Sequence, residues 1–354
     1  MAATAPQRGV PQAGSSLRIA QIAPIAAPVS PQSGRSIEKV VSLLTEGLVA
    51  RGHRVTLFAT LDSTTFAALE GRYAEGYRSD AGLWDWTLHE SLHAGHAFSR
   101  AGEFDVIHAH NYHFALPFAG LTPVPVVITC HVLADAQVVT AMAEGTVHAV
   151  ALSEYQAAQM AAVARLTVIP NGFELDAFPK PGARGGYLLY LGVVSRRKGA
   201  PDAIEIARLA GRPLVIAGPW GDARAQVEPL VDGEWVRHVG AVGMAERNSL
   251  LSGADALLYP INEPEAFGLV LVEAMACGTP VVARALGAVP ELIEPGATGH
   301  HARTNVELAE LVAQAAGLQR SVIRERATRF SDARMVERYV ALYHALAGQR
   351  MAIR

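Results

Sequence analysis

Short apolar runs and helix-forming stretches alternate along the first half of the chain. An apolar run over residues 17–23 is followed by a loop that contains Gly34, by a helix predicted over about residues 37–51, and by a second apolar run over residues 55–59. Strands that are buried on both faces of a parallel sheet have such continuous apolar sequences, and strand, glycine loop, helix and strand form a βαβ unit. Further apolar runs over residues 104–110, 124–131, 148–153 and 166–169 extend the pattern. It predicts a first doubly wound domain over residues 17–179.

The same alternation begins again after a stretch rich in glycine and proline. Residues 180–186 read Lys-Pro-Gly-Ala-Arg-Gly-Gly, and new strands are predicted over residues 187–192, 214–218, 236–240 and 254–260. Such a composition is typical of a domain boundary. We therefore expect a second α/β domain over residues 180–328 and a terminal amphipathic helix over residues 329–354. Residues 1–16 are rich in Pro, Gly and Ser and are predicted to be a disordered leader.

Residues 263–283 combine a loop, a helix and a strand in one stretch. The helix is predicted from Leu269 to Ala276, directly after Gly268, and it ends at Cys277-Gly278 before an apolar strand. A helix that starts after a glycine-containing loop presents free N–H groups, which bind phosphate well.

Two carboxylates, Glu265 and Glu273, flank this predicted phosphate site with seven residues between them. A retaining glycoside hydrolase needs its carboxyl groups about 5 Å apart. Eight helical steps span roughly 12 Å, which disfavours that pair. Two interpretations remain: the carboxylates accept hydrogen bonds from hydroxyl groups of one long ligand, or they are a solvated loop residue and an exposed helix residue.

Composition and charge exclude several other classes. The chain has 354 residues, 50% of them hydrophobic, and a formal net charge of -3, so no nucleic-acid surface is indicated. Cys130 and Cys277 have no metal or redox spacing and are predicted to be buried thiols in a reducing compartment. His89, His93 and His96 share a helix face and are not assigned to a metal. No run of 18 apolar residues occurs, and we predict a cytoplasmic protein.

From Phe267 to Val282 the sequence closely resembles family 4 of the retaining glycosyltransferases with the GT-B fold, the glycosyl transferases group 1. The resemblance implies two Rossmann-like domains that face each other across a cleft. It also implies that Glu265 contacts hydroxyls of a donor sugar and that Glu273 binds the nucleotide ribose. The backbone amides of Phe267, Gly268 and Leu269 would hold the sugar and the diphosphate.

Shorter motifs extend the resemblance to both halves. In the first, Ser33-Gly34 stands where the family has a glycine pair, and Thr129-Cys130-His131 matches a position whose histidine orients the donor sugar. We expect structural roles for His108 and His110.

In the second half, the family has Gly-Arg, four residues and Lys-Gly. Here the arginine is replaced by Val193 and the lysine is Lys198, which would neutralise the leaving diphosphate. Arg196 or Arg197 could substitute for the missing cation, or donor binding is weakened or altered.

The resemblance thus implies a retaining, metal-independent hexosyltransferase that uses a UDP- or GDP-sugar and no further cofactor. His131, Glu265 and Lys198 are the expected catalytic residues, with donor contacts at Gly34, Arg197, Val242, Phe267, Gly268, Leu269 and Glu273. We expect a soluble rather than a lipid acceptor, and no oligomeric state is predicted. Two alternatives are a catalytically silent relative that acts as a binding subunit and a two-domain sugar-binding protein.

Overall fold

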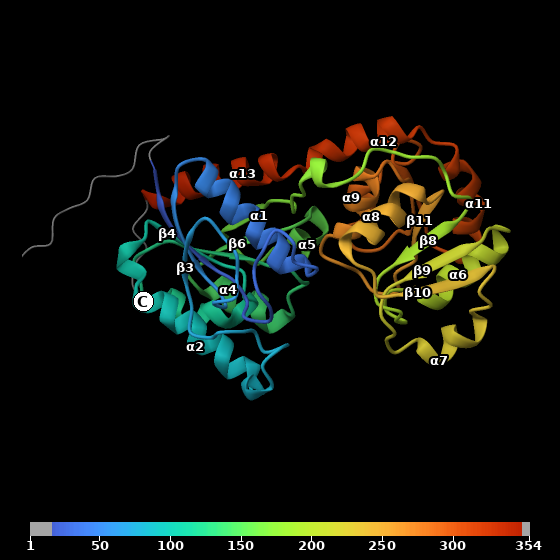
Figure 1. The fold of residues 1–354 in the computed structure, drawn as a ribbon. Coiled ribbons are helices and arrows are strands. Elements are labelled where there is room, and N and C mark those ends of the chain that lie inside the picture. The colour runs from blue at the N-terminus through green and yellow to red at the C-terminus, as the bar shows by residue number, and fades with distance from the viewer. Residues whose placement is uncertain (1–15, 349–354) are drawn as a thin grey trace, which may run out of the picture. The chain divides into compact units, whose positions relative to one another are not determined.

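The computed structural model describes residues 16–348. These residues form two compact units (Figure 1). The first unit contains the chain up to Ala151, residues Met160–Ile169 and the chain from Met335. The second contains Leu152–Gln159 and Pro170–Arg334. Apart from Ser16, the predicted leader lies outside the described residues, as do the last six residues of the predicted terminal segment. Among residues 16–348, no helix is both long and apolar enough to cross a membrane.

The first unit is built on a parallel sheet of seven strands in the order β3-β2-β1-β4-β5-β6-β7. Its strands are β1 (Arg18–Ile22), β2 (Arg54–Phe58), β3 (Ala68–Glu70), β4 (Val106–Ala109), β5 (Val126–Thr129), β6 (His148–Ala151) and β7 (Leu166–Val168). Its helices are α1 (Ser36–Ala50), α2 (Trp86–Ser99), α3 (Leu116–Ala119), α4 (Ala136–Glu144) and, from Met335 on, α13 (Asp332–Ala347). The predicted βαβ order is confirmed.

The turn between α1 and β2 shows why a Gly-His pair stands there. Gly52 has a φ of +82°, a conformation that favours glycine, and its N–H donates to the carbonyl of Val49 at 2.9 Å. The His53 ring then accepts a hydrogen bond at Nδ1 from the N–H of Leu17, at 3.2 Å. The pair ends the helix and holds the start of β1.

The C-terminal helix α13 packs on α1 and on the sheet of the first unit. It touches α1 locally, because a Cβ added at Gly47 of α1 would lie 2.5 Å from a methyl group of Val336 in α13. Tyr339 and Tyr343, four residues apart and therefore on one face of α13, are almost completely buried. The glycine lets the two helices approach closely, and this brings the tyrosines over the strands.

The second unit is built on a parallel sheet of six strands in the order β10-β9-β8-β11-β12-β13. Its strands are β8 (Leu188–Leu191), β9 (Leu214–Ala217), β10 (Val236–Gly240), β11 (Ala256–Tyr259), β12 (Val281–Arg284) and β13 (Gly299–Ala302). Its helices are α5 (Glu154–Gln159), α6 (Ala200–Leu209), α7 (Arg224–Val227), α8 (Met244–Gly253), α9 (Leu269–Ala276), α10 (Val289–Leu292), α11 (Asn305–Ala316) and α12 (Arg320–Ala327).

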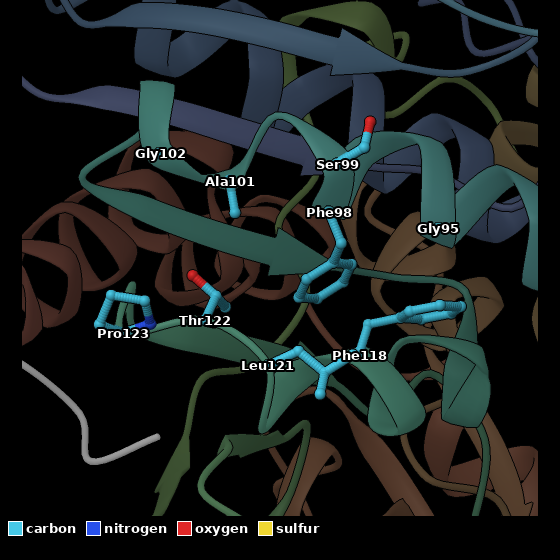
Figure 2. A pocket seen from close by; sticks show the side chains of 9 residues that line it. All are labelled: Gly95, Phe98, Ser99, Ala101, Gly102, Phe118, Leu121, Thr122 and Pro123. Carbon is cyan, nitrogen blue, oxygen red and sulfur yellow. The ribbon is translucent and has the colours of Figure 1, made fainter. Parts of the chain in front are cut away.

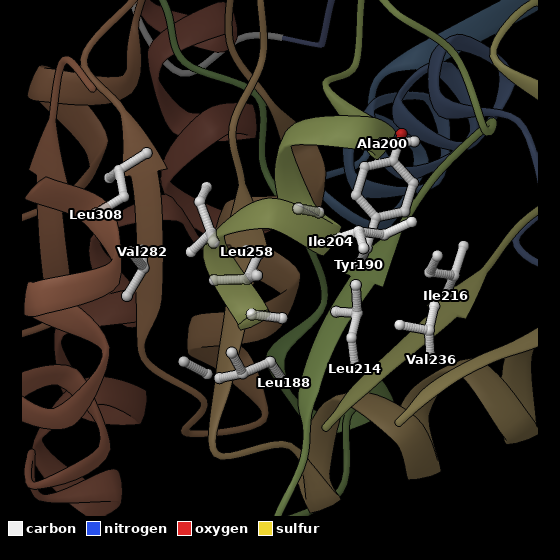
Figure 3. Packing of buried hydrophobic residues seen from close by; sticks show 14 of the residues in the cluster. Leu188, Tyr190, Ala200, Ile204, Leu214, Ile216, Val236, Leu258, Val282 and Leu308 are labelled. Atoms are coloured by element: carbon white, nitrogen blue, oxygen red, sulfur yellow. The ribbon is translucent and has the colours of Figure 1, made fainter. Parts of the chain in front are cut away.

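Apolar side chains from adjacent strands and helices form the core of this second unit. Leu188, Leu214, Leu258 and Val282 come from four strands, and they pack with Ile204 of α6 and Leu308 of α11 (Figure 3). All six side chains are at most 1% exposed. Burial on both faces of the sheet explains why the strands have continuous apolar sequences.

Residues 61–102, where the sequence pattern is weak, contain β3 and α2. His93 of this helix is fully buried, and the Nδ1 atom of His89 lies 3.1 Å from the hydroxyl of Tyr73. No group of three or more metal-ligating side chains occurs among residues 16–348. Cys130 and Cys277 are buried thiols, and burial raises the pKa of each to about 12.

A cavity of about 390 Å³ lies between α2 and the segment that precedes β5. Phe98 and Phe118 stack at 5.6 Å between ring centroids and line it with Leu121 (Figure 2). Because Thr122 and Pro123 come before the strand, this cavity lies at the amino edge of the sheet. It is therefore remote from the carboxyl edge, where parallel α/β sheets bind ligands.

Candidate active site

The strand order of the second unit indicates where its sheet would bind a ligand. The chain adds β9 and β10 on one side of β8, and then returns to place β11, β12 and β13 on its other side. The loops after β8 and β11 consequently leave the sheet in opposite directions. Open α/β sheets bind ligands at this switch point, beyond the carboxyl ends of the strands. Lys198 follows β8 and Glu265 follows β11, so both predicted residues lie there.

Glu265 is the centre of a charged cluster at this switch point. Lys198 Nζ donates a hydrogen bond to Glu265 Oε1, and Arg197 donates to the same oxygen at 3.1 Å. The hydroxyl of Tyr259, the last residue of β11, donates to Oε2. The Glu265 side chain is 17% exposed and that of Lys198 is 24% exposed. The interpretation of Glu265 as a solvated loop residue is therefore wrong. The cluster brings together Glu265, Lys198 and Arg197, which the sequence analysis predicts, and Tyr259, which it does not.

Electrostatics keep this carboxylate charged. Burial alone would raise the pKa of Glu265, yet the charge and hydrogen bond of Lys198 and the hydroxyl of Tyr259 hold that pKa below its ordinary value. Burial and the neighbouring carboxylate raise the pKa of Tyr259 well above its usual range. The cluster at neutral pH thus contains an ionised acceptor, a neutral phenol and two cations.

Close backbone contacts hold the loops that carry this cluster. Gly287 has a φ of +59°, and a Cβ there would lie 2.5 Å from the backbone N and O of Glu265. The next residue, Ala288, donates its N–H to the Glu265 carbonyl at 3.2 Å. On the other side, the N–H of Asn262 donates to the carbonyl of Arg197 at 2.9 Å. The loops after β8, β11 and β12 are therefore connected through their main chains.

The helix α9 begins as predicted, with Gly268 as its N-terminal flanking residue. The φ of Gly268 is +102°, which a residue with a Cβ adopts only with strain. Phe267 is buried and packs edge-to-face on Phe330, with 5.8 Å between ring centroids. Leu269, the first residue of the helix, is half-buried. The packing of Phe267 and the left-handed conformation of Gly268 together hold the backbone of this turn.

Glu273, one turn into α9, is only 5% exposed, so it is not the exposed helix residue of the second interpretation. Both its carboxylate oxygens accept hydrogen bonds from the guanidinium of Arg247 in α8, one of them at 2.8 Å. Burial would lower the pKa of Arg247, but the charge and hydrogen bonds of Glu273 raise it. Sequence analysis missed Arg247, because α8 has little apolar periodicity and no residue spacing connects the two helices.

Val193 and Val242 lie in loops at the same edge of this sheet. The Val193 side chain is 46% exposed, and a Cβ at Gly221 would lie 2.8 Å from one of its methyl groups. The carbonyl of Val193 accepts a hydrogen bond from the Tyr190 hydroxyl at 2.7 Å. Val242 is half-buried between β10 and α8. At position 193 the chain therefore presents an apolar side chain in a partly exposed loop.

His131 and Gly34 belong to the first unit. His131 follows β5, is half-buried, and lies with its Nε2 atom 2.9 Å from Nδ1 of His110. Desolvation by surrounding protein atoms lowers the pKa of His131 to about 4. Gly34 is exposed, and a Cβ at this position would meet no atom within 4 Å. The local fold therefore does not require glycine at position 34.

Family models match two consecutive parts of the chain. Residues 37–177 match the model described as Glycosyltransferase Family 4, and residues 176–332 match Glycosyl transferases group 1. The phosphatidyl-myo-inositol mannosyltransferase of Mycobacterium tuberculosis is 30% identical over 329 residues, which cover 82% of this chain and 85% of that protein.

Solved structures have the same architecture. AviGT4, a glycosyltransferase involved in avilamycin A biosynthesis, superposes with a TM-score of 0.73 and 25% identity over 94% of this chain and 98% of its own. HepE of Anabaena, solved in complex with UDP and glucose, has a TM-score of 0.69 at 19% identity over 93% of this chain and 100% of its own.

Two parallel sheets with this topology define the GT-B class of glycosyltransferases, as the sequence resemblance implied. The family matches and the mycobacterial relative specify the group within that class. The chain belongs to glycosyltransferase family 4.

Proposed function

We propose that this glycosyltransferase moves a hexosyl unit from a UDP- or GDP-sugar to an acceptor, with retention at the anomeric carbon and without a metal ion. The observation that carries the proposal is the cluster of Glu265, Lys198 and Arg197 at the β8/β11 switch point, next to the start of α9. An ionised acceptor for sugar hydroxyls, two cations and the N–H groups of a helix start suit the two ends of a nucleotide-diphosphate sugar. HepE, which shares the fold, was solved with UDP and glucose.

In the proposed reaction the bond between the anomeric carbon and the diphosphate oxygen breaks. The acceptor hydroxyl attacks from the same face, forms the new glycosidic bond and gives its proton to the leaving phosphate oxygen. Lys198 and Arg197 stabilise the negative charge that develops on the diphosphate, as the α9 N–H groups do. Glu265 and His131 orient the sugar and do not act as nucleophiles.

Glu273 would accept hydrogen bonds from the ribose hydroxyls in this scheme. Its oxygens already accept from Arg247, so the guanidinium would fix the orientation of the carboxylate while the remaining lone pairs receive the ribose. Gly34 and the amides of Phe267 to Leu269 are the other proposed donor contacts, with the base near Val242. The cytoplasmic location and the soluble acceptor stay predictions.

The first test is a thermal-shift panel of UDP, GDP and ADP and their hexose conjugates. A ligand that binds the folded state at 100 times its Kd stabilises it by about 2.7 kcal/mol. We expect one nucleotide series to raise the melting temperature, and Lys198→Met to abolish the shift. Lys180→Met, which changes an exposed lysine of the same unit, is the matched control. No shift with any nucleotide at millimolar concentration would contradict the proposal.

One observation favours the alternative of a catalytically silent relative. Val193 is 46% exposed where the family motif has arginine, so one phosphate-binding cation is missing from this loop. Arg197 lies in the same loop and already contacts Glu265, which supports an active enzyme with a substituted cation. The variant Val193→Arg distinguishes an active enzyme from a silent relative. If the protein is an active enzyme, the variant binds the donor more tightly than wild type or equally well. If only the variant binds the donor, the protein is a silent relative. Membership of the glycosyltransferase family argues against a solute-receptor function.

A further inference from the structure

The sheet of the first unit contains polar side chains where a buried parallel sheet usually has apolar ones. Gln21 of β1, His108 of β4 and Thr129 of β5 are all fully buried, and Gln21 pairs in register with His108. Buried polar groups cost free energy unless they are hydrogen-bonded. Their partners are each other, His110 and the two tyrosines of α13.

These side chains form one continuous chain of hydrogen bonds. His131 Nε2 lies 2.9 Å from His110 Nδ1, and His110 Nε2 lies 2.7 Å from Gln21 Oε1. Gln21 Nε2 donates to the Tyr343 hydroxyl at 3.1 Å, which lies 2.6 Å from His108 Nδ1. His108 Nε2 lies 2.8 Å from Thr129 Oγ1, and Thr129 Oγ1 lies 2.8 Å from the Tyr339 hydroxyl. We call these seven residues the buried relay.

The relay has a direction because an amide has one accepting end and one donating end. The Gln21 oxygen faces His110 Nε2, so that nitrogen carries the proton. Burial lowers the pKa of His110 well below its ordinary value, so its other nitrogen, Nδ1, is bare and accepts from Nε2–H of His131. His131 is then the Nε2–H tautomer, and its Nδ1 atom offers a lone pair to a hydroxyl group.

The other half of the relay holds the amide in this orientation. Gln21 donates to the Tyr343 oxygen, which leaves the hydroxyl proton of Tyr343 to be donated to His108 Nδ1. Because burial keeps His108 neutral, with its pKa well below the usual value, its Nε2–H donates to Thr129. Each link therefore determines the direction of the next one.

We propose that Tyr343, acting through Gln21 and His110, is a positioning residue that sets the tautomer of His131. The C-terminal helix thereby determines which nitrogen of the catalytic histidine can accept a hydrogen bond from the donor sugar. The role of His131 rests on the proposed function, whereas the relay itself is a property of the protein without donor.

Two variants change the relay in different ways. Tyr343→Phe removes only the hydroxyl, so the Gln21 amide loses the partner that orients it and both tautomers of His131 become populated. Thr129→Val removes the acceptor for His108 Nε2–H, which favours a proton on His108 Nδ1 instead. Each donor and acceptor between His108 and His131 then exchanges its role, and the Gln21 amide turns over. His131 then becomes the Nδ1–H tautomer. Val336→Ala is the control, because it weakens the contact of α13 with Gly47 and leaves every member of the relay in place.

The test is ¹⁵N NMR of the imidazole rings in the donor-free protein labelled at its 13 histidines, with His131→Gln to assign the signals of His131. We expect the Nε2–H tautomer in wild type and in Val336→Ala, a mixture in Tyr343→Phe, and the Nδ1–H tautomer in Thr129→Val. In transfer assays, kcat should fall about 3- to 10-fold in Thr129→Val, as one lost hydrogen bond predicts. In Tyr343→Phe, where part of the protein keeps the Nε2–H tautomer, kcat should fall by less than about 3-fold, and KM should change less than about twofold in both variants.

The outcomes separate the relay from the proposed function. One unchanged tautomer of His131 in wild type, Tyr343→Phe and Thr129→Val would overturn the relay, even if the enzyme is active. Altered tautomers with an unchanged kcat would overturn the positioning role. A protein that binds no nucleotide sugar but shows the expected tautomers would contradict the proposed function and leave the relay established. If Tyr343→Phe does not fold, Thr129→Val carries the test.

Discussion

The ion pair of Lys198 and Glu265 supports a quantitative prediction. We consider Lys198→Met, Glu265→Gln and the double variant, each of which keeps most of the side-chain volume. Lys198→Met leaves Glu265 with Arg197 and Tyr259, whereas Glu265→Gln leaves the lysine beside a neutral amide. If the pair stabilises the site, the double variant should be more stable than the sum of the two single effects predicts.

The structure sets the size of this coupling. Two unit charges about 4 Å apart interact by roughly 4 kcal/mol at an effective dielectric constant of about 20. Lys198 is 24% exposed and Glu265 is 17% exposed, so solvent screens part of that energy. Arg197 also donates to the same carboxylate oxygen and compensates for the loss of the lysine. We therefore expect a coupling free energy of about 1.5–3 kcal/mol, in the range measured for residues in contact.

The assay is urea unfolding of the four proteins, followed by the binding of the nucleotide that the thermal-shift panel identifies. The variants with methionine at position 198 should lose donor binding, because the cation that meets the diphosphate is absent. A coupling below about 0.5 kcal/mol would refute the ion pair as a stabilising contact. Donor binding that survives in Lys198→Met would refute the assigned role of the lysine, whatever the coupling.

Three further predictions concern buried groups and backbone contacts. Burial raises the pKa of Glu90 to about 8, above its value of 4.5 in the unfolded chain. Between these values the folded protein holds a proton that the unfolded chain releases, so the free energy of unfolding should fall by about 1.4 kcal/mol for each unit that the pH rises from roughly pH 5 to 7.5. Glu90→Gln should remove this contribution, and identical pH slopes of wild type and variant in urea unfolding would contradict it. Gly287→Ala should cost about 2–4 kcal/mol of stability, because its Cβ would collide with the backbone of the loop after β11, whereas Gly34→Ala should change stability by less than about 0.5 kcal/mol. A near-neutral Gly287→Ala in thermal unfolding would show that this loop can move. Arg247→Met should lower the free energy of unfolding by about 2–4 kcal/mol, because it leaves the buried Glu273 carboxylate without its guanidinium partner. Adding Glu273→Met should recover part of that stability. A double variant that is less stable than Arg247→Met would exclude the unpaired carboxylate as the cause.

Local patterns predicted most strands and several helices of the protein. The helix predicted from Leu269 to Ala276 has these bounds in the structure. Continuous apolar runs and glycine stops are encoded by neighbouring residues, so they are visible without tertiary contacts. Between residues 61 and 102 the pattern is weak, and β3, with only three residues, was not predicted.

For the site, the order of residues along the chain already indicates which side chains have the right chemistry: Glu265 and Lys198 lie in loops after strands, and Gly268 lies before a helix. The partners of these residues depend on how the chain folds. Tyr259 and Arg247 became part of the site through packing between separate elements, and neither had a local signal. Tyr343 meets His108 across 235 positions of sequence. Such pairings depend on how the strands and helices are ordered in space, because hydrogen bonds need atoms within about 3 Å. A linear pattern specifies residue types and periodicities, whereas these distances arise only when the sheet and its covering helices assemble.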